Sequence, residues 1–154
     1  MKLLILSDSH GYIYNLEEIL KKERSADMII HLGDGADDMM LMTEYTQGKL
    51  VYLCKGNCDS YVYGFTEKVI LPIENTRIFA CHGHEYGVKY GLYKLYYAAK
   101  QEEAGLCLYG HTHIPKCDAE EDMFIVNPGS VSGGNYAVAE ITGDKITTVN
   151  KSLS

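Results

Sequence analysis

Short aliphatic runs alternate with amphipathic segments through the first third of the chain. Polar residues bound each run, and its length is typical of a buried strand; the runs lie at residues 2–7, 28–32 and 49–53. Leu16, Ile19 and Leu20 repeat at helical spacing after the first run, and Asn15 with Glu18 is predicted to form the capping box of this helix. A second helical repeat follows the second run, at Ala36, Met39, Met40 and Thr43. Strands that alternate with helices predict parallel pairing with right-handed crossovers.

The remainder of the chain is richer in strands. Residues 68–73 and 76–81 flank Glu74-Asn75 and are predicted to form a hairpin. The next helix is expected to end at Gly105 as a left-handed cap, and its apolar positions are Leu92, Leu95, Tyr96 and Ala99. Further strands are predicted at residues 106–109, 116–119, 123–127, 136–142 and 145–150. Parallel strands followed by antiparallel ones predict an α/β fold, in which two sheets form a sandwich with helices outside.

Composition and charge narrow the class of protein. The 154 residues are 46% hydrophobic and 23% charged, which is near the globular average, so a single domain over residues 1–154 is expected. The apolar runs are too short to span a bilayer, and no export signal is recognised, so the cytoplasm is the expected compartment. Five cysteines, an odd number, favour reduced thiols. A net charge of −7 argues against a broad phosphate-backbone footprint on nucleic acid.

Polar residues gather directly after five of the predicted strands. Ligands in open α/β sheets bind outside the carboxyl ends of the strands, so the five clusters are expected to face one site. In an extended segment, residues i and i+2 point to the same side, which would let Asp8 and His10, and likewise His111 and His113, present two ligands together. The clusters are Asp8-Ser9-His10, Gly33-Asp34, Gly56-Asn57-Cys58-Asp59, His82-Gly83-His84 and Gly110-His111-Thr112-His113.

The residue types in these clusters are those of a site for two divalent metal ions. Imidazole nitrogen combined with carboxylate oxygen suits Zn, Mn, Fe, Co or Ni better than Ca. Asp34 has two carboxylate oxygens and could bridge two ions, while Asn57 offers a neutral amide oxygen. Each cluster alone has a structural alternative: a solvated loop for Asp-x-His, a helix cap for Gly-Asp, and a turn for Gly-Asn-Cys-Asp. The ordered set of five favours the metal site.

Other chemically reactive side chains are interpreted as structural. His31 lies inside a predicted strand and is expected to be a core or sheet-face histidine, whereas His84 is left open between a structural role and a substrate contact. The tyrosines within residues 86–97 are expected in the core or on the helix surface rather than in a platform that stacks bases, and some could line a subunit interface. Small buried hydrophobic positions are expected for Cys54, Cys81, Cys107 and Cys117.

The ordered motifs resemble those of the calcineurin-like metallophosphoesterase superfamily, over residues 8–132. Gly-Asn-Cys-Asp, and Asn-Pro-Gly-Ser-Val-Ser at residues 127–132, are similar to the small bacterial and archaeal phosphodiesterases of the YfcE type. The resemblance implies a four-layer α/β/β/α sandwich of two mixed sheets, the metallo-dependent phosphatase fold. It also implies a centre of two metal ions bridged by Asp34, with Asp8, His10 and His113 on one ion and Asn57, His82 and His111 on the other.

Two positions depart from the superfamily pattern. Many members carry His where this chain has Cys58, and that His, held by the following Asp (here Asp59), contacts phosphate or protonates the leaving group. A thiol is a weak donor. Asn57, Cys58 and Asp59 are the candidate catalytic residues, and His84 is the candidate substrate contact. Relatives often carry Pro and a basic residue after Ser-Val-Ser, where this chain has Gly133-Gly134, so a cationic phosphate contact is expected to be missing.

The resemblance implies a hydrolase that cleaves phosphodiester bonds by attack of a hydroxide held between two metal ions. Two divalent ions per subunit are the expected cofactors: manganese first, with Ni, Co, Fe, Zn or Mg as alternatives. The expected partner is a small phosphate ester rather than nucleic acid or a membrane, and a homo-oligomer is left open. The alternatives are a non-catalytic protein-binding scaffold on the same fold, like the retromer subunit, and a nuclease. The intact ligand positions favour the enzyme.

Overall fold

The strands form two five-stranded sheets. The structure is a computed structural model that describes residues 1–154, apart from the side chain of Val62. The first sheet contains Lys2–Leu6 (β1), Met28–His31 (β2), Leu50–Leu53 (β3), Asn135–Thr142 (β9) and Lys145–Ser152 (β10), in the order β10-β9-β1-β2-β3. The second contains Lys68–Ile73 (β4), Thr76–Cys81 (β5), Leu106–Leu108 (β6), Lys116–Glu120 (β7) and Met123–Asn127 (β8), in the order β4-β5-β6-β8-β7.

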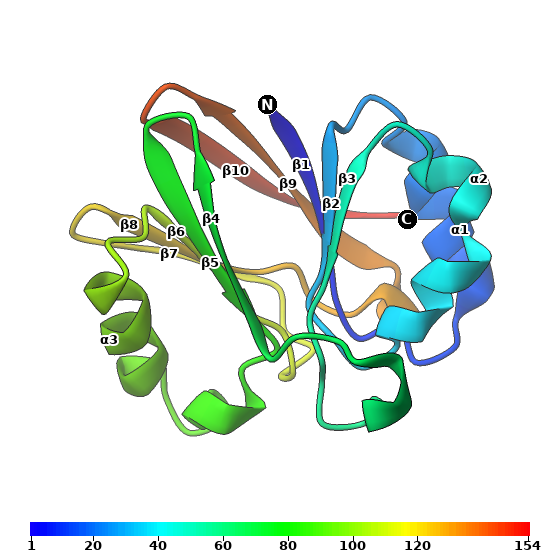
Figure 1. The fold of residues 1–154 in the computed structure, drawn as a ribbon, viewed down its shortest axis with the longest axis horizontal. Helices are drawn as coiled ribbons and strands as arrows, with labels where there is room; N and C mark the ends of the chain where they lie inside the picture. The colour runs from blue at the N-terminus through cyan, green and yellow to red at the C-terminus, as the bar shows by residue number, and fades with distance from the viewer.

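Helices cover the outer faces of both sheets, so that the molecule has four layers (Figure 1). Outside the first sheet lie α1 (Ile13–Lys22), α2 (Thr43–Thr46) and the 3-10 helix η1 (Ala36–Leu41), the last two in place of one predicted helix. Outside the second sheet lies α3 (Tyr93–Gln101). Short 3-10 helices occupy three loops: Tyr61–Tyr63 (η2), His84–Tyr86 (η3) and Val131–Gly133 (η4). The predicted α/β/β/α sandwich is confirmed.

The alternation of side chains along each central strand produces the layers. In β1, Leu3 and Ile5 pack in the core between the two sheets, whereas Leu4 and Leu6 pack with Leu16 of α1. β5 alternates in the same way between the inter-sheet core and the side of α3. Both faces of these strands are buried, which explains why their sequences are continuous hydrophobic runs.

The pairing of strands differs from the prediction in the second half of the chain. β1, β2 and β3 are parallel, as predicted. β5, β6 and β8 are also parallel, although antiparallel strands were expected there. The antiparallel strands β9 and β10 return to the first sheet, where β9 pairs with β1. Both sheets are therefore mixed, and the two ends of the chain share one sheet.

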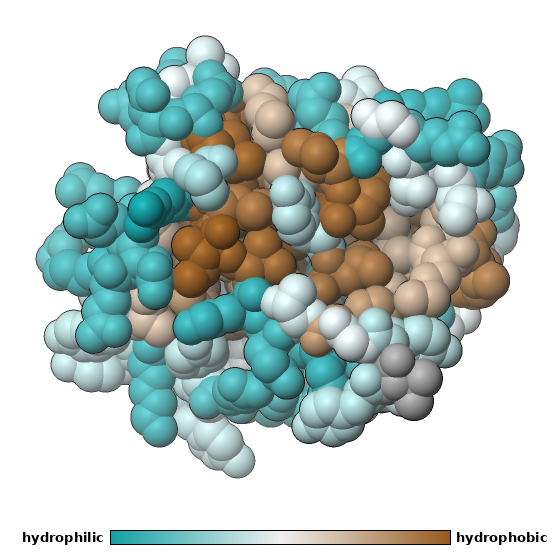
Figure 2. All heavy atoms as spheres, in the orientation of Figure 1, coloured by the Kyte–Doolittle hydropathy of each residue, from teal (hydrophilic) through white to brown (hydrophobic). Residues whose placement is uncertain are grey.

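The inter-sheet core reaches the surface at the edge strands β3 and β4. Tyr52 and Leu71 are partly buried against this core, and Leu50 is half exposed. Figure 2 shows apolar side chains over the middle of this face, between the two sheets. Pro72 lies within β4 and has no N–H to donate, which limits the pairing of a further strand at that edge.

Asn15 does not cap α1, so the predicted capping box is wrong. The helix begins at Ile13, and no side chain caps its first turn. Asn15 lies inside the helix, where its Nδ2 donates to the carbonyl oxygens of Val131 (3.1 Å) and Ser132 (3.2 Å). The amide therefore satisfies backbone acceptors of η4, a long-range contact that the local sequence pattern does not reveal.

Gly105 is not the left-handed cap of α3, so this prediction is also wrong. Glu103 takes the left-handed conformation, with φ 56°, just after the end of the helix. A Cβ on Gly105 would overlap Thr76 Oγ1, so glycine is required there because the backbone approaches a neighbouring strand closely.

The cysteines follow the prediction with one exception. Cys54, Cys81 and Cys107 are buried, and all five thiols are free. Cys117 is exposed on β7, with Sγ 3.1 Å from Thr148 Oγ1, because it lies on the outer strand of its sheet rather than in the core. None of the helices in the described part of the chain has the length and apolar character needed to cross a bilayer.

Candidate metal centre

The five polar clusters converge at one end of the two sheets, at the bottom of the view in Figure 1. Each cluster lies in the loop that follows a strand: β1, β2, β3, β5 and β6. Backbone hydrogen bonds tie these loops together: Asp8 N to Gly33 O (2.9 Å), His10 N to Asp34 O (3.1 Å) and Gly110 N to His82 O (2.9 Å). The expectation that strand ends would bring these residues to one place is confirmed.

Left-handed backbone conformations are concentrated at this end of the sheets. Five of the seven residues predicted as ligands have positive φ: Asp8 (54°), His10 (44°), Asp34 (58°), His111 (70°) and His113 (64°). Such conformations cost of order 1 kcal/mol or more for a residue with a side chain, and they persist where the surroundings enforce them. The premise of extended segments with i and i+2 on one side is therefore wrong, because the backbone turns sharply at each of these residues.

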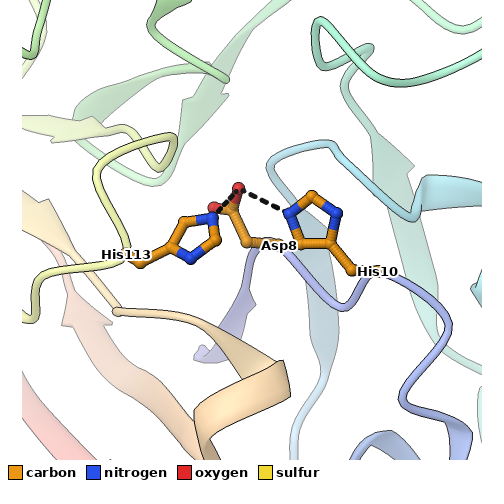
Figure 3. A group of neighbouring side chains, drawn as sticks. All are labelled: Asp8, His10 and His113. Carbon is orange, nitrogen blue, oxygen red and sulfur yellow. Dashed lines mark ion pairs between the residues drawn. The ribbon is translucent and has the colours of Figure 1, made fainter.

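The two oxygens of the buried Asp8 carboxylate have different surroundings. Oδ2 accepts hydrogen bonds from Ser7 Oγ (2.5 Å) and the His111 backbone N–H (3.0 Å). Oδ1 has no hydrogen-bond partner within the described structure, and it lies 3.1 Å from His113 Nε2 and 3.6 Å from His10 Nε2 (Figure 3). A buried carboxylate oxygen without a partner is costly unless a cation compensates it. Asp8, His10 and His113 therefore fit a metal ion.

Asp34, His82 and His111 form a second group. His82 Nε2 lies 3.2 Å from Asp34 Oδ2 and 3.1 Å from His111 Nδ1. His82 Nδ1 donates to Leu32 O at 2.9 Å, which leaves Nε2 directed at the group, as in histidines that bind metals. Burial disfavours a charge on His82, but Asp34 and Asp8 outweigh it and raise its pKa. The carboxylates that favour a proton here would also favour a cation.

Asp34 lies between the two groups. Its Oδ2 is 3.8 Å from His10 Nε2 of the first group, besides its contact to His82 of the second. Its Oδ1 accepts from the Cys58 backbone N–H at 2.7 Å. Burial opposes ionisation of Asp34, but the hydrogen bond and charge of His82 hold the pKa of this carboxyl well below its ordinary value. An ionised carboxylate in this position can serve both groups.

The comparisons with known proteins agree with this geometry. Residues 1–144 match the model of the calcineurin-like phosphoesterase superfamily domain. The chain belongs to this superfamily. Phosphodiesterase YfcE of Escherichia coli K12 is 32% identical, over 89% of this chain and 84% of that protein. Members of the superfamily depend on metal ions, which accords with the residue groups described above.

Two solved structures show the same fold. A conserved uncharacterized protein from Streptococcus pneumoniae TIGR4, described as a predicted phosphoesterase, superposes with a TM-score of 0.81 and 30% identity, over 98% of this chain and 88% of the other. Vps29 from Entamoeba histolytica, in complex with Zn²⁺, gives a TM-score of 0.79 with 20% identity, over 99% and 93%. At that identity the second likeness concerns the fold alone.

Within this superfamily fold, Cys58 lies beside the two candidate metal groups, and Asp59 points to the backbone of the loops. Cys58 Sγ lies within 4.8 Å of ligand atoms of His10 and Asp34. Burial and the neighbouring Asp34 raise the pKa of the Cys58 thiol, so that it is protonated at neutral pH. Asp59 instead accepts three backbone N–H bonds, all at 2.8 Å, from Asp34, Gly35 and Gly56. Both oxygens of Asp59 are thereby engaged, so this side chain holds the loops after β2 and β3 together. Its role beside position 58 stays a prediction.

Asn57 and His84 lie at the edge of the two groups. Asn57 is exposed, and its Nδ2 donates to Cys58 Sγ at 3.5 Å. The His84 ring is 5.4 Å from the His82 ring and 6.1 Å from the His111 ring. Burial, followed by the charge of His82, lowers the pKa of His84, so its imidazole is neutral at pH 7. The roles of Asn57 as a ligand and of His84 as a substrate contact stay predictions.

Several residues without a predicted role hold the loops around the site. Asp38 Oδ2 accepts from Ser9 Oγ (2.7 Å) and the Gly11 N–H (2.9 Å), which fixes the loop after β1. Ser130 Oγ donates to Asp8 O at 2.7 Å, and Asn127 Nδ2 donates to Gly110 O at 3.1 Å. Ser130 and Asn127 belong to the Asn-Pro-Gly-Ser motif, which resembles that of the small phosphodiesterases. This motif was the sequence feature that could have indicated their role in holding the loops.

His31 is the structural histidine that the sequence predicted. It is fully buried in β2, where Nδ1 accepts from the Gly33 N–H (3.1 Å) and Nε2 lies 2.9 Å from Ser9 Oγ. Burial lowers its pKa to about 4, so the ring is neutral and connects the loops after β1 and β2.

The buried His31 makes stability depend on pH. Because an unfolded histidine has a pKa of about 6.5, the unfolded chain binds more protons than the folded one between that value and about 4. The contribution of His31 to the free energy of unfolding is therefore complete above pH 6.5 and is lost as the pH drops through this window. Between pH 7 and pH 5 the loss from this residue is about 2 kcal/mol. Urea unfolding of metal-free protein at both pH values measures it. His31→Gln should lose this part of the dependence, and an identical dependence in the variant would contradict the assignment.

Proposed function

We propose that this protein is a metal-dependent phosphodiesterase that hydrolyses small phosphate esters. The observation that carries the proposal is the Asp8 Oδ1 atom, a buried carboxylate oxygen without a hydrogen-bond partner in the described structure. Imidazole nitrogens of three histidines, His10, His82 and His113, lie within 3.9 Å of it. Membership of the superfamily and the likeness to a relative named phosphodiesterase support the reaction type. A scaffold needs no metal site, and the net charge of −7 disfavours a nuclease, so we place both alternatives behind the phosphodiesterase.

Two divalent ions are proposed, with Asp34 shared between them. One would be held by Asp8, His10 and His113, and the other by Asn57, His82 and His111. Ions bound there would supply an activated water and neutralise the charge of the phosphate. Mixed imidazole and carboxylate donors suit Mn and its first-row neighbours, and manganese is the ion that we propose first.

The site would bind an anionic ester only when cations neutralise its carboxylates. Asp8 and Asp34 are buried carboxylates, and their negative charges alone would repel a phosphate. The bond from the Asp34 N–H to Asp59 and the bond from the Cys58 N–H to Asp34 Oδ1 hold Asp34 in place, and the Ser7 hydroxyl and the His111 N–H hold Asp8. Rigid placement of charged groups before the substrate arrives is what electrostatic catalysis requires.

The candidate proton donor to the leaving group is a thiol, which is a weak donor. The protonated Cys58 thiol stands at the sequence position where many superfamily members carry histidine, and we propose that His84 contacts the substrate. General acid help is typically worth about 10²–10⁴-fold. The enzyme is therefore expected to prefer esters with good leaving groups, which need little protonation.

Removal of metal tests the proposed function. The purified protein should hydrolyse bis-p-nitrophenyl phosphate, lose this activity after exhaustive chelation, and regain it with Mn, Ni or Co. Elemental analysis before and after chelation links turnover to bound metal. Turnover that persists in a protein shown to be free of metal would refute the proposal, and so would a fully metal-loaded protein that hydrolyses no phosphate ester.

A further inference from the structure

A groove of about 1010 Å³ lies beside the metal centre, between α3 and β7. Its lining includes Thr112 and Ile114, which flank His113 in the chain. The same groove reaches the tyrosines of α3: Tyr93, Tyr96 and Tyr97. Its size is that of sites that enclose small organic molecules. One continuous depression thus runs from the loop of the proposed ligands to an aromatic helix surface.

The floor of the groove is apolar and rigid. Val88, Tyr109 and Ile125 line it, and each is at most 5% exposed. They belong to the core between the second sheet and α3. A floor made of core side chains does not need to rearrange when a ligand binds, which favours binding of an apolar group.

Exposed aromatic and aliphatic side chains form the walls. Tyr93 is 72% exposed, Tyr97 is 45% exposed, and Ile114 is 63% exposed, although each lines the groove. The rings of Tyr93 and Tyr97 are 4.6 Å apart at 64°, and their hydroxyl groups lie 3.1 Å apart. The two rings therefore hold each other in place and present a fixed surface on which a flat ring can pack.

The charges along the groove favour an ester whose phosphate points toward the metal centre. Lys100 is paired with Glu121 at 3.1 Å, and Lys116 is paired with Asp118 at 3.5 Å. Lys89 also lines the groove, and within the described residues it has no ion-pair partner. It lies in the loop after η3, the 3-10 helix that begins at His84. Glu120 of β7 also lines the groove, and no ion pair to it occurs within the described residues. The unpaired cation is thus on the side of the proposed ligands, while the far part carries an unpaired carboxylate that would repel a phosphate.

We propose that this groove binds a planar aromatic group, an aryl ring or a nucleobase, of a phosphate ester whose phosphate lies at the metal centre. The inference rests on the proposed function and narrows its substrate to aromatic or nucleoside phosphodiesters. Stacking on tyrosine is favourable for any base or aryl ring, because each presents a π face. The ring would lie against Tyr93 and Tyr97, over the apolar floor.

Paired inhibitors that differ only by the ring test this proposal. Phenylphosphonate and methylphosphonate share one headgroup, as do AMP and ribose 5-phosphate. In the metal-loaded enzyme, the inhibitor with the ring should bind about tenfold more tightly, the factor expected from one stacking contact. In Tyr93→Ala/Tyr97→Ala the two members of a pair should bind within twofold of each other, with methylphosphonate unchanged. Alanine suits these exposed helix positions. Tyr14→Ala, at an exposed tyrosine of α1, is the matched control and should keep the difference.

The outcomes separate this inference from the proposed function. If the double variant loses the affinity difference between AMP and ribose 5-phosphate, the groove binds a nucleobase. If it loses only the difference between phenylphosphonate and methylphosphonate, the groove binds an aryl ring. Both results support the inference. Equal affinities in the wild type, or a difference that survives the double variant, would overturn it. If the metal-loaded protein hydrolyses no ester, the proposed function fails, and NMR then tests the groove directly. In that case AMP should shift the amide signals of Tyr93 and Tyr97, and unshifted signals would overturn the inference.

Discussion

Asp34→Asn is expected to lower the metal content by more than one ion per subunit and to reduce hydrolysis of bis-p-nitrophenyl phosphate by more than about 100-fold, beyond the range typical of residues that merely support metal ligands. The reason is its position between the two groups. Asp34 Oδ2 lies 3.2 Å from His82 Nε2 and 3.8 Å from His10 Nε2, so one carboxylate serves both. The amide keeps the shape of the side chain and removes its charge, which weakens both proposed sites together.

Two variants make this result specific. Asp37→Asn makes the same change of charge three residues further along, at a side chain outside all the candidate metal groups of the described chain, and it should retain metal and turnover. His10→Ala should mainly empty one site, because His10 lies beside Asp8 and Asp34 but belongs to no group with His82. Inductively coupled plasma analysis gives the ion count for each variant. An Asp34→Asn protein with two ions and full turnover would show that Asp34 does not bridge.

The strands and the location of the site were predictable from the sequence, although the pairing of the later strands was not. Both faces of β1 and β2 are buried, so their sequences are unbroken aliphatic runs, and such runs followed by polar residues predict strand ends at a shared site. The seven candidate ligands could be found in this way because each stands directly after such a run or close to it. Superfamily resemblance then supplied their division into two sets, which spacing alone leaves open.

The local geometry of the site was not predictable. The positive φ angles of Asp8, His10 and His113 run against the ordinary preference of residues with side chains, and only tertiary contacts such as Ser130 Oγ to Asp8 O enforce them. The same holds for Asp59, whose three N–H donors come from two loops far apart in the sequence. The predicted cap of α1 was wrong for a related reason. The local pattern assigns Asn15 to the cap, but its amide donates to a backbone carbonyl more than 100 residues away.

The groove beside α3 illustrates a further limit of sequence patterns. Tyr93 and Tyr97 are four residues apart and predict a helix surface, and the structure places them there. Nothing in their spacing indicates that β7, which begins 19 residues after Tyr97, forms the opposite wall. A binding surface made from a helix and a non-consecutive strand becomes visible only when the sheet order is known.

Gly56→Ala is expected to abolish detectable turnover and to destabilise the protein by about 1–3 kcal/mol, the usual cost of forcing extra atoms into a packed interior. A Cβ on Gly56 would overlap the Asp34 backbone nitrogen and Oδ1, and it would lie 2.9 Å from Asp34 Cγ. Backbone atoms cannot swing aside as the end of a flexible side chain can. The loops after β2 and β3 would have to separate. This breaks the bonds that Asp59 accepts from the Asp34 and Gly35 N–H groups, and it displaces the carboxylate shared by the two candidate metal groups.

Gly133→Ala is the matched control for this substitution. Gly133 also has an ordinary φ, and an added Cβ would meet only Asn135 Nδ2, the end of a side chain, at 3.3 Å. It should therefore retain metal, turnover and most of its stability. Metal content, turnover of bis-p-nitrophenyl phosphate and the urea midpoint distinguish the effects in both variants. A Gly56→Ala protein that folds, binds two ions and keeps wild-type turnover would contradict the close approach of the two loops, and with it the role of Asp59 in holding Asp34 between the two groups.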